Sequence, residues 1–270
     1  MSYKIGFIGA GNMGGCLITA ATQTTMSKDI CVFDKDAEKA NYYSENYDVV
    51  SASLDEVLEA QIIVMGVKPQ VYQILIDSIK DKICNREDDF LVVSMAAGVS
   101  MDSICEMFGK RIPLIRIMPN MACDTNEGVM VYDSNELVSH TTESEFVKIF
   151  SNVGLLDKLD ENLIDAACAV TGCGPAFVYM FIEAMADGVV ACGLPREKAI
   201  AYSAQMMKGA AAKTLEGEHP EKLKDKVCSP GGSTIAGVIS LENAGFRGAV
   251  NSAVTSAYQR NKDLGKKNID

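Results

Sequence analysis

A glycine-rich turn near the N-terminus constrains this chain more than any other feature. Gly9, Gly11 and Gly14 have the spacing G-x-G-x-x-G, and they follow the apolar run 4–8 and open a helical pattern. In that context the first glycine makes a tight turn, the second lets backbone approach a pyrophosphate, and the third lets helix pack on strand. Amide groups at the helix N-terminus attract phosphate oxygens. The turn therefore predicts a dinucleotide-binding βαβ unit.

An acidic residue stands where such a unit binds the adenosine ribose. Asp34 lies 20 residues beyond Gly14, at the end of the next predicted strand, 30–34. Its carboxylate would accept hydrogen bonds from the ribose hydroxyls and repel a 2′-phosphate, which favours NAD. Lys35 beside it would offset that repulsion and admit NADP. The sequence leaves NADH and NADPH both open, with a slight lean to NADH.

The first half of the chain alternates short apolar runs with amphipathic segments. This pattern predicts a Rossmann, doubly wound parallel sheet with right-handed crossovers and helices on both faces. Capping boxes of Ser53 with Glu56 and of Thr142 with Glu145 predict two helix starts. The predicted strands are 4–8, 30–34, 62–67, 90–95, 114–118, 128–132 and 153–156.

From about residue 160 strand patterns give way to helical ones, which predicts a dinucleotide-binding domain at 1–160 and an all-α domain at 161–270. Gly193 followed by Pro195 predicts that one helix ends and the next opens with proline in its first turn. So many apolar residues in a small helical domain suggest that a second subunit covers part of it, as a dimer or larger assembly. The predicted helices are 162–170, 175–192, 195–216, 234–243 and 246–264.

Composition excludes several classes of partner. The net charge of −11 disfavours attraction to nucleic acid or to an anionic membrane. We expect no signal peptide and no apolar stretch long enough to span a membrane. The nine cysteines are scattered without a CxxC pair, so we expect reduced thiols in a cytoplasmic protein and no metal site.

Two further segments fall at strand ends, where a doubly wound sheet presents ligands. One is Val67-Lys68-Pro69-Gln70, and the other is Ser94-Met95-Ala96-Ala97-Gly98. The small Ala96 and Ala97 suit a backbone wall close to a nicotinamide. Lys68 is equally well explained as a solvated cation at the end of a strand.

In the second half, the turn at residues 229–234 is the most informative segment. Pro230-Gly231-Gly232 leads into Ser233 and Thr234 and an amphipathic helix. A serine or threonine there is expected to cap the helix, while the glycines leave neighbouring amides exposed. Such amides suit a carboxylate. A plain interhelical turn explains the same residues, and the residues alone leave the two readings open.

With these motifs together, the chain resembles the pyrroline-5-carboxylate reductases. The matching segments follow the family's order and span nearly the whole chain: Gly6-Phe7-Ile8-Gly9-Ala10-Gly11-Asn12-Met13, Val67-Lys68-Pro69-Gln70, Arg116-Ile117-Met118-Pro119-Asn120, Gly172-Cys173-Gly174-Pro175-Ala176-Phe177, Ser229-Pro230-Gly231-Gly232-Ser233-Thr234-Ile235-Ala236-Gly237 and Leu241-Glu242-Asn243-Ala244-Gly245-Phe246-Arg247. The glycine fingerprint is common to many dehydrogenases, whereas the segment around residues 229–237 is highly specific.

The resemblance implies reduction of 1-pyrroline-5-carboxylate to L-proline by NADH or NADPH, the last step of proline biosynthesis. It implies a helical dimerisation domain that intertwines with that of a second subunit, an active site where one subunit's Rossmann domain meets its partner's helices, and often a larger ring of dimers. It also implies that Thr234 is catalytic and closest to the ring nitrogen. The implied substrate residues are Ser229, Gly231, Gly232, Ser233 and Thr234. The implied dinucleotide residues are Gly9, Gly11, Asn12, Met13, Val67, Lys68, Ala96, Ala97 and Asn120.

The residue types fit this chemistry. A cyclic imine accepts hydride at carbon once its nitrogen is protonated or strongly hydrogen-bonded, and the Thr234 hydroxyl can donate that bond. An imidazole base is then unnecessary, and the sequence holds only His140, expected in a loop before the Thr142 helix, and His219.

The chain departs from the family pattern at a few positions. Gly14 stands where alanine is usual, and Cys173 and Cys228 stand where serine or threonine is usual, so hydrogen bonding at the two cysteines is in doubt. Glu216 and Glu218 both precede His219-Pro220, where the family often has one acidic residue, and the sequence does not distinguish between them.

Two other functions are weighed against the reductase. A β-hydroxyacid dehydrogenase needs a lysine on the first long interlobe helix, and residues 162–192 hold no lysine or arginine. A non-catalytic dinucleotide sensor or helical scaffold would not need the turn at residues 229–234.

Overall fold

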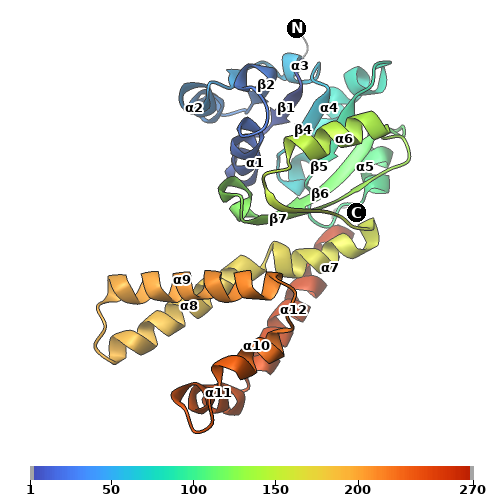
Figure 1. Cartoon of the computed structure of the whole chain (residues 1–270). Coiled ribbons are helices and arrows are strands. Elements are labelled where there is room, and N and C mark those ends of the chain that lie inside the picture. Colours follow the sequence, from blue (N-terminus) through green and yellow to red (C-terminus); the bar gives the residue numbers. More distant parts are fainter. Residues whose placement is uncertain (1–2, 268–270) are drawn as a thin grey trace. The chain divides into compact units, whose positions relative to one another are not determined.

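The computed structural model describes residues 3–267, with side chains as far as Asp263. It forms two compact units (Figure 1). The sheet unit comprises the chain up to Gly172 together with the residues from Tyr258 onward. The helical unit is Cys173–Ala257.

The sheet unit is built on eight strands in the order β3-β2-β1-β4-β5-β6-β7-β8. The six strands from β3 to β6 are parallel to one another, which confirms the doubly wound fold. All seven predicted strands are present with ends shifted by no more than two residues, and the short β3 was not predicted. The strands are β1 (Ile5–Ile8), β2 (Ile30–Phe33), β3 (Val50–Ser51), β4 (Ile62–Met65), β5 (Leu91–Ser94), β6 (Leu114–Pro119), β7 (Gly128–Ser134) and β8 (Gly154–Lys158).

The sheet reverses direction once. Strand β7 runs antiparallel to β6, and β8 then pairs parallel with β7. Only residues 120–127 connect β6 to β7, and this link is too short for the crossover that a parallel pair needs. It contains the 3₁₀ helix η3 (Met121–Thr125).

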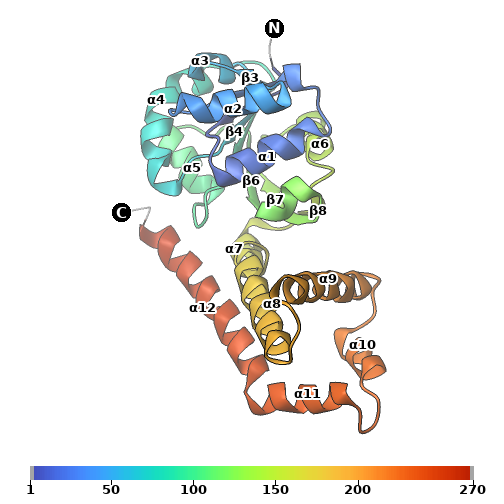
Figure 2. The same ribbon diagram turned by 90° about the vertical axis from the view of Figure 1, so that its left-hand side faces the viewer.

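Helices cover both faces of the sheet (Figures 1 and 2). Because side chains alternate along a strand, Phe7 and Val64 join one core while Ile8 and Ile63 join the other. The first core is completed by α1 (Asn12–Thr22), α2 (Ala37–Tyr47) and α6 (His140–Ile149). The second is completed by α3 (Leu54–Val57), α4 (Tyr72–Cys84) and α5 (Met101–Phe108).

One of the two predicted capping boxes is correct. Ser53 and Glu56 cap α3 reciprocally, as expected. The box at Thr142 is wrong, because α6 begins at His140 and its N-cap is Ser139, whose hydroxyl accepts from the Thr142 amide at 3.1 Å. His140 is consequently the first residue of the helix and does not lie in a loop.

Five helices follow Gly172. They are α8 (Gly174–Ala191), α9 (Arg196–Leu215), α10 (Pro220–Val227), α11 (Ser233–Asn243) and α12 (Phe246–Lys267). Helices α8 and α9 lie side by side and are joined by a short turn (Figure 2). Helix α10 was not predicted. Pro195 is the N-cap of α9, one position before the first turn in which it was expected.

The helix α7 (Glu161–Thr171) belongs to the sheet unit by its packing. It lies against β6 and β7, where Ile164 and Cys168 are buried with Met118 and Val131. The compact helical unit therefore starts at Cys173, after the boundary expected at residue 161.

The expectation that no apolar stretch could span a membrane is wrong by length and composition. Glu161–Ala191 is 31 residues long with a mean hydropathy of 1.4 in its most apolar window, and little of that window is buried. Exposed apolar side chains continue in the helical unit, where Tyr179, Met180 and Leu215 are 66%, 69% and 85% exposed.

A buried arginine ties α7 to the sheet. Arg116 on β6 is 2% exposed, and its guanidinium bonds Asp165 at 2.6 Å and Glu161 at 3.4 Å. Glu161 also accepts from the backbone amide of Met101 at 2.7 Å, and its own amide donates to Asp133 at 2.8 Å. The charge of Arg116 thus holds together β6, α7 and the start of α5.

We predict that Arg116→Met lowers the free energy of unfolding by about 2–4 kcal/mol, because it leaves two carboxylates without their cation. Arg111→Met is the matched control, since Arg111 also bonds two carboxylates, those of Asp102 and Glu136, but is exposed. Thermal unfolding followed by circular dichroism should show a clear loss for the first variant and little change for the second. Equal losses would contradict the role given to the buried guanidinium.

Candidate dinucleotide and substrate sites

The eleven predicted dinucleotide residues lie at the carboxyl ends of five parallel strands. Since parallel strands end at one edge of a sheet, the fold brings them to a common edge, where doubly wound sheets bind their ligands. They are Gly9, Gly11, Asn12 and Met13 after β1, Asp34 and Lys35 after β2, Val67 and Lys68 after β4, Ala96 and Ala97 after β5, and Asn120 after β6.

The three fingerprint glycines differ in what surrounds them. Gly9 has φ +105°, a conformation that side chains disfavour, and a Cβ on it would lie 2.7 Å from the carbonyl oxygen of Gly66. A Cβ on Gly14 would lie 2.2 Å from the carbonyl oxygen of Gly9. A Cβ on Gly11 would meet no protein atom within 4 Å. A side chain on the first or third glycine would therefore force the backbone of this turn to shift, whereas the second faces open space that a ligand can fill.

Asp34 is bonded to the glycine turn itself. One carboxylate oxygen accepts from the amide of Ala10 at 2.7 Å, and the other accepts from the amide of Asp36 at 2.9 Å. The side chain is half-buried, and Lys35 beside it is exposed. The carboxylate is thus fixed next to the turn, with lone pairs left to accept further hydrogen bonds.

A small pocket of about 350 Å³ adjoins this corner of the sheet unit. It is bounded by Ala10 of the turn and by side chains of Asp36, Glu38, Lys39, Tyr42 and Tyr43 from the start of α2. The ammonium of Lys39 lies 3.6 Å from the carboxylate of Asp36. The ionisable lining of the pocket is mainly acidic.

At the ends of β4 and β5 the predicted residues differ in exposure. Ala96 is fully buried, Val67 and Ala97 are half-buried, and Lys68 is exposed as the N-cap of η2 (Pro69–Val71). Sequence reasoning overlooked Tyr72 and named Ser94 only as the start of a strand-end segment; both are fully buried. A tyrosine that opens an apolar helix face shows no sequence pattern that separates it from ordinary core.

Asn120 is 8% exposed, and its side chain is engaged with backbone. Its amide oxygen accepts from the amides of Ala122 at 3.2 Å and Val129 at 3.3 Å, and its nitrogen donates to the carbonyl of Thr171 at 3.0 Å. These bonds join the end of β6 to β7 and to the end of α7. The Asn120 side chain therefore helps to fix the loop between β6 and β7.

The predicted substrate residues come together in one turn of the helical unit. The amide of Gly232 donates to the carbonyl of Ser229 at 3.0 Å, and Gly231 between them has φ +67°. The expectation that Ser233 or Thr234 caps α11 is wrong, because Gly232 is the N-cap and Ser233 and Thr234 are the first two helical residues. Because the N-cap Gly232 has no side chain, the first amides of α11 donate no hydrogen bond to a capping side chain and keep the capacity to bind an anion.

The other residues noted before this turn have structural partners. Glu216 is paired with Lys213 at 2.8 Å, and Glu218 with Lys226 at 2.6 Å. His219 is the N-cap of α10 and accepts from the amide of Glu221 at 3.3 Å. Cys173 and Cys228 are half-buried, and none of the nine cysteines forms a disulfide.

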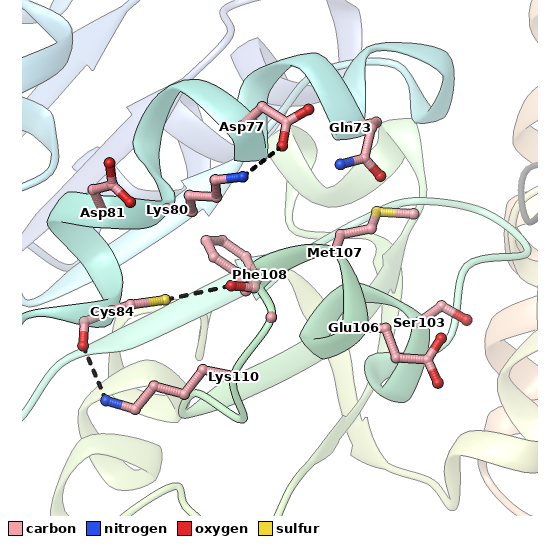
Figure 3. A pocket seen from close by; sticks show the side chains of 11 residues that line it. Gln73, Asp77, Lys80, Asp81, Cys84, Ser103, Glu106, Met107, Phe108 and Lys110 are labelled. Carbon is pink, nitrogen blue, oxygen red and sulfur yellow. Dashed lines mark hydrogen bonds and ion pairs between the residues drawn. The ribbon is translucent and has the colours of Figure 1, made fainter.

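The pocket in Figure 3 lies away from these residues. It has a volume of about 740 Å³, lies between α4 and α5, and is lined by none of the predicted site residues. Several of its polar groups bond one another: Lys80 bonds Asp77, Lys110 donates to the carbonyl of Cys84, and the Cys84 thiol donates to the carbonyl of Phe108. Among the described residues, no group of three or more histidine, cysteine, aspartate or glutamate side chains is placed to hold a metal.

Fold and site define the class of protein. A doubly wound sheet with a glycine fingerprint, followed by a helical unit, is typical of the two-domain oxidoreductases that use a nicotinamide dinucleotide. Residues 161–264 match the family described as pyrroline-5-carboxylate reductase dimerisation, and residues 4–98 match the family described as NADP oxidoreductase coenzyme F420-dependent.

Whole-length relatives make the family specific. The chain is 38% identical over 271 residues to the pyrroline-5-carboxylate reductase of Escherichia coli (strain K12), covering 98% of this chain and 100% of the relative. It is 36% identical over 267 residues to that of Pisum sativum, covering 97% and 96%. The crystal structure of Plasmodium falciparum pyrroline carboxylate reductase with NADP bound has a TM-score of 0.87 at 30% identity, covering 97% of this chain and 98% of that one. The chain belongs to the pyrroline-5-carboxylate reductase family, and the resemblance seen in the sequence is confirmed.

Membership of the pyrroline-5-carboxylate reductase family explains why the segment Glu161–Ala191 is so apolar. It lies inside the region 161–264 that matches the dimerisation model. Its exposed apolar side chains therefore belong to a region that associates with another chain in a soluble enzyme family.

The open space at Gly11 gives a prediction that separates ligand approach from folding. Gly11→Ala should leave the melting temperature unchanged, because the added methyl group meets no protein atom. It should weaken dinucleotide binding at least tenfold if a pyrophosphate fills that space. Isothermal titration with NADH and NADPH measures the binding.

Gly14→Ala is the contrasting variant, because its methyl group would lie 2.2 Å from the carbonyl oxygen of Gly9. It should lower the melting temperature as well as the affinity. Unchanged affinity in Gly11→Ala would show that no ligand approaches that glycine.

Proposed function

We propose that this chain catalyses the reduction of 1-pyrroline-5-carboxylate to L-proline with NADH or NADPH, the last step of proline biosynthesis. The observation that carries the proposal is identity of 38% with a pyrroline-5-carboxylate reductase along the whole length of both chains. Bound dinucleotide would supply the hydride that is added to the imine carbon. The open face of Gly11, the half-buried Asp34 and the uncapped start of α11 fit the two anionic ligands of that reaction.

The substrate carboxylate is proposed to bind the turn at Ser229, Gly231, Gly232, Ser233 and Thr234. A helix N-terminus whose first amides lack a side-chain cap attracts an anion even in a chain of net charge −11. Thr234 is the second residue of α11 and is half-buried, and its hydroxyl would donate to the imine nitrogen. Water would then restore the proton, so no imidazole is needed.

The dinucleotide is proposed to bind along the common edge of the sheet. Gly9, Gly11, Asn12 and Met13 would hold the pyrophosphate, and Val67, Lys68, Ala96 and Ala97 would lie towards the nicotinamide. Asn120 would act at this edge by shaping its loop, since its side chain already bonds three backbone groups.

Of the two cofactors, NADH is favoured. A 2′-phosphate on the adenosine ribose would approach Asp34, Asp36 and Glu38, with only Lys35 and Lys39 as nearby cations along the segment, and Lys39 is close to Asp36. Repulsion by the carboxylates would then exceed attraction. The Plasmodium falciparum relative has NADP bound, so cofactor choice is expected to vary within the family.

In the cell, the enzyme is proposed to be a cytoplasmic homodimer that assembles further into a ring of dimers. The exposed apolar side chains of α8 and α9 support association through the helical unit. Each active site would combine residues from two subunits.

A β-hydroxyacid dehydrogenase is the main competing function, and it is disfavoured because Glu161–Ala191, spanning α7 and α8, has no lysine for its acid–base step. Proline-dependent reduction of NAD⁺ or NADP⁺ at high pH tests the proposal directly. Activity with proline and none with 3-hydroxy acids supports the reductase, the reverse supports the dehydrogenase, and none with either supports a non-catalytic role.

Thr234→Ala is expected to lower kcat at least a hundredfold while dinucleotide affinity changes less than threefold, because it removes only the hydrogen bond to the imine nitrogen. Thr234→Ser keeps the hydroxyl and should retain most of the activity. Steady-state kinetics with the cyclic imine and titration with NADH measure the two effects. Equal turnover in the alanine variant would remove Thr234 from the mechanism.

Asp34→Ser should shift the ratio of kcat/KM for NADH over NADPH at least tenfold towards NADPH, since it removes the carboxylate nearest the ribose. Glu45→Gln removes one negative charge from an exposed position later on α2 and serves as the control. Its ratio should match that of the parent enzyme. An unchanged ratio in Asp34→Ser would mean that Asp34 does not face the ribose.

A further inference from the structure

We propose that Tyr72 is a positioning residue whose buried hydroxyl fixes the ends of β4 and β5, and so holds the two loops that face the nicotinamide half of the dinucleotide. The identification of the ligand as a nicotinamide dinucleotide rests on the proposed function. The positioning itself is argued from contacts of the sheet unit alone.

The hydroxyl of Tyr72 is fully committed to these two strand ends. The ring is 0% exposed at the start of α4. The hydroxyl donates to the carbonyl of Met65 at 2.9 Å, and it accepts from the Ser94 hydroxyl at 3.1 Å and from the Met95 amide at 3.3 Å. A phenol has one proton to donate and two lone pairs, so its bonding capacity is filled.

These contacts lie where the ladder between the two strands stops. Met65 and Ser94 are the last paired residues of β4 and β5. Beyond them the chain continues as Gly66, Val67 and Lys68 on one side and as Met95, Ala96 and Ala97 on the other. The phenol thus joins the two segments just past the point at which strand pairing ends.

Ser94 extends the connection into the second loop. Its hydroxyl accepts from the amide of Ala96 at 3.3 Å while it donates to Tyr72. Gly98, two residues further on, has φ +73°. The Val99 amide also donates to the carbonyl of Ala96 at 3.4 Å. The buried hydroxyl network adds to these contacts and favours one defined conformation of the loop.

Titration does not disturb this network at physiological pH. Burial raises the pKa of the Tyr72 phenol to about 12, against the opposing effect of the bonds from Ser94 and Met95. The hydroxyl therefore remains a donor to Met65 across the working range of an enzyme.

The topology connects these loops with one half of the dinucleotide. A doubly wound sheet binds the two mononucleotides on either side of the point where strand order reverses. Here β1 and β2 carry the glycine turn and Asp34, so the adenosine half belongs to them, and the nicotinamide half falls to β4 and β5. Loss of the Tyr72 hydroxyl should consequently affect the whole dinucleotide and spare its adenosine half.

The test is Tyr72→Phe in the full-length protein, with binding of NADH and of ADP-ribose measured by isothermal titration. We expect the Kd for NADH to rise about fivefold to tenfold, as for the loss of one or two buried hydrogen bonds. The Kd for ADP-ribose should stay within twofold. A purely structural defect would weaken both ligands by the same factor, and that result, or an unchanged Kd for NADH, overturns the proposal.

Tyr132→Phe is the matched control, since Tyr132 is also buried but packs against Phe146 on the far side of the sheet unit from α4 and α5. It should leave both affinities unchanged. If Tyr72→Phe fails to fold, Ser94→Ala decides: weaker NADH binding with ADP-ribose spared supports the proposal, and parental affinity for NADH overturns it. Isothermal titration measures binding and needs no turnover, so it can be carried out even if the imine assay shows no activity. Failure of the proposed function and failure of this proposal are therefore distinguishable.

Discussion

Close contact between two backbone segments underlies the rest of this structure. The turn after β1 and the end of β4 approach so closely that a Cβ on Gly66 would lie 2.8 Å from the carbonyl oxygen of Gly9, and one on Gly14 would lie 2.2 Å from it. In this geometry a side chain on Gly9, Gly14 or Gly66 would force the backbone to shift. The contact brings the start of α1 to the point where strand order reverses, and it is there that the sheet can offer amides to a diphosphate.

The same contact explains how an acidic chain can hold anions. With a net charge of −11, long-range attraction cannot collect an anionic ligand. The candidate sites instead use backbone amides at the starts of α1 and α11, neither of which has a side-chain cap at its N-cap. Asp34 fixes the first of these turns, because its carboxylate accepts from the Ala10 amide.

Much of this could be predicted from sequence because the signals are local. The fingerprint, Asp34 and seven strands depend on short-range spacing and alternation, and the family follows from motifs along the whole chain. Contacts between distant segments had no such signal: the Asn120 amide bonds the carbonyl of Thr171, and Tyr72 bridges two strands. The start of α6 was placed wrongly for a local reason, because Ser139 and Thr142 are both residues that can cap a helix. The predicted N-cap of α11 was wrong, because Gly232 occupies that position and not Ser233 or Thr234.

Composition alone also misjudges the helices after the sheet. Glu161–Ala191 is long and apolar enough to span a membrane, and only 17% of its most apolar window is buried. Tyr179, Met180 and Leu215 are likewise exposed. A helical unit that exposes these side chains lacks a sufficient core of its own. In a family whose model for residues 161–264 is one of dimerisation, that missing core is supplied by a second chain. Helix α7, which Arg116 anchors to the sheet, leads along the chain into this helical unit.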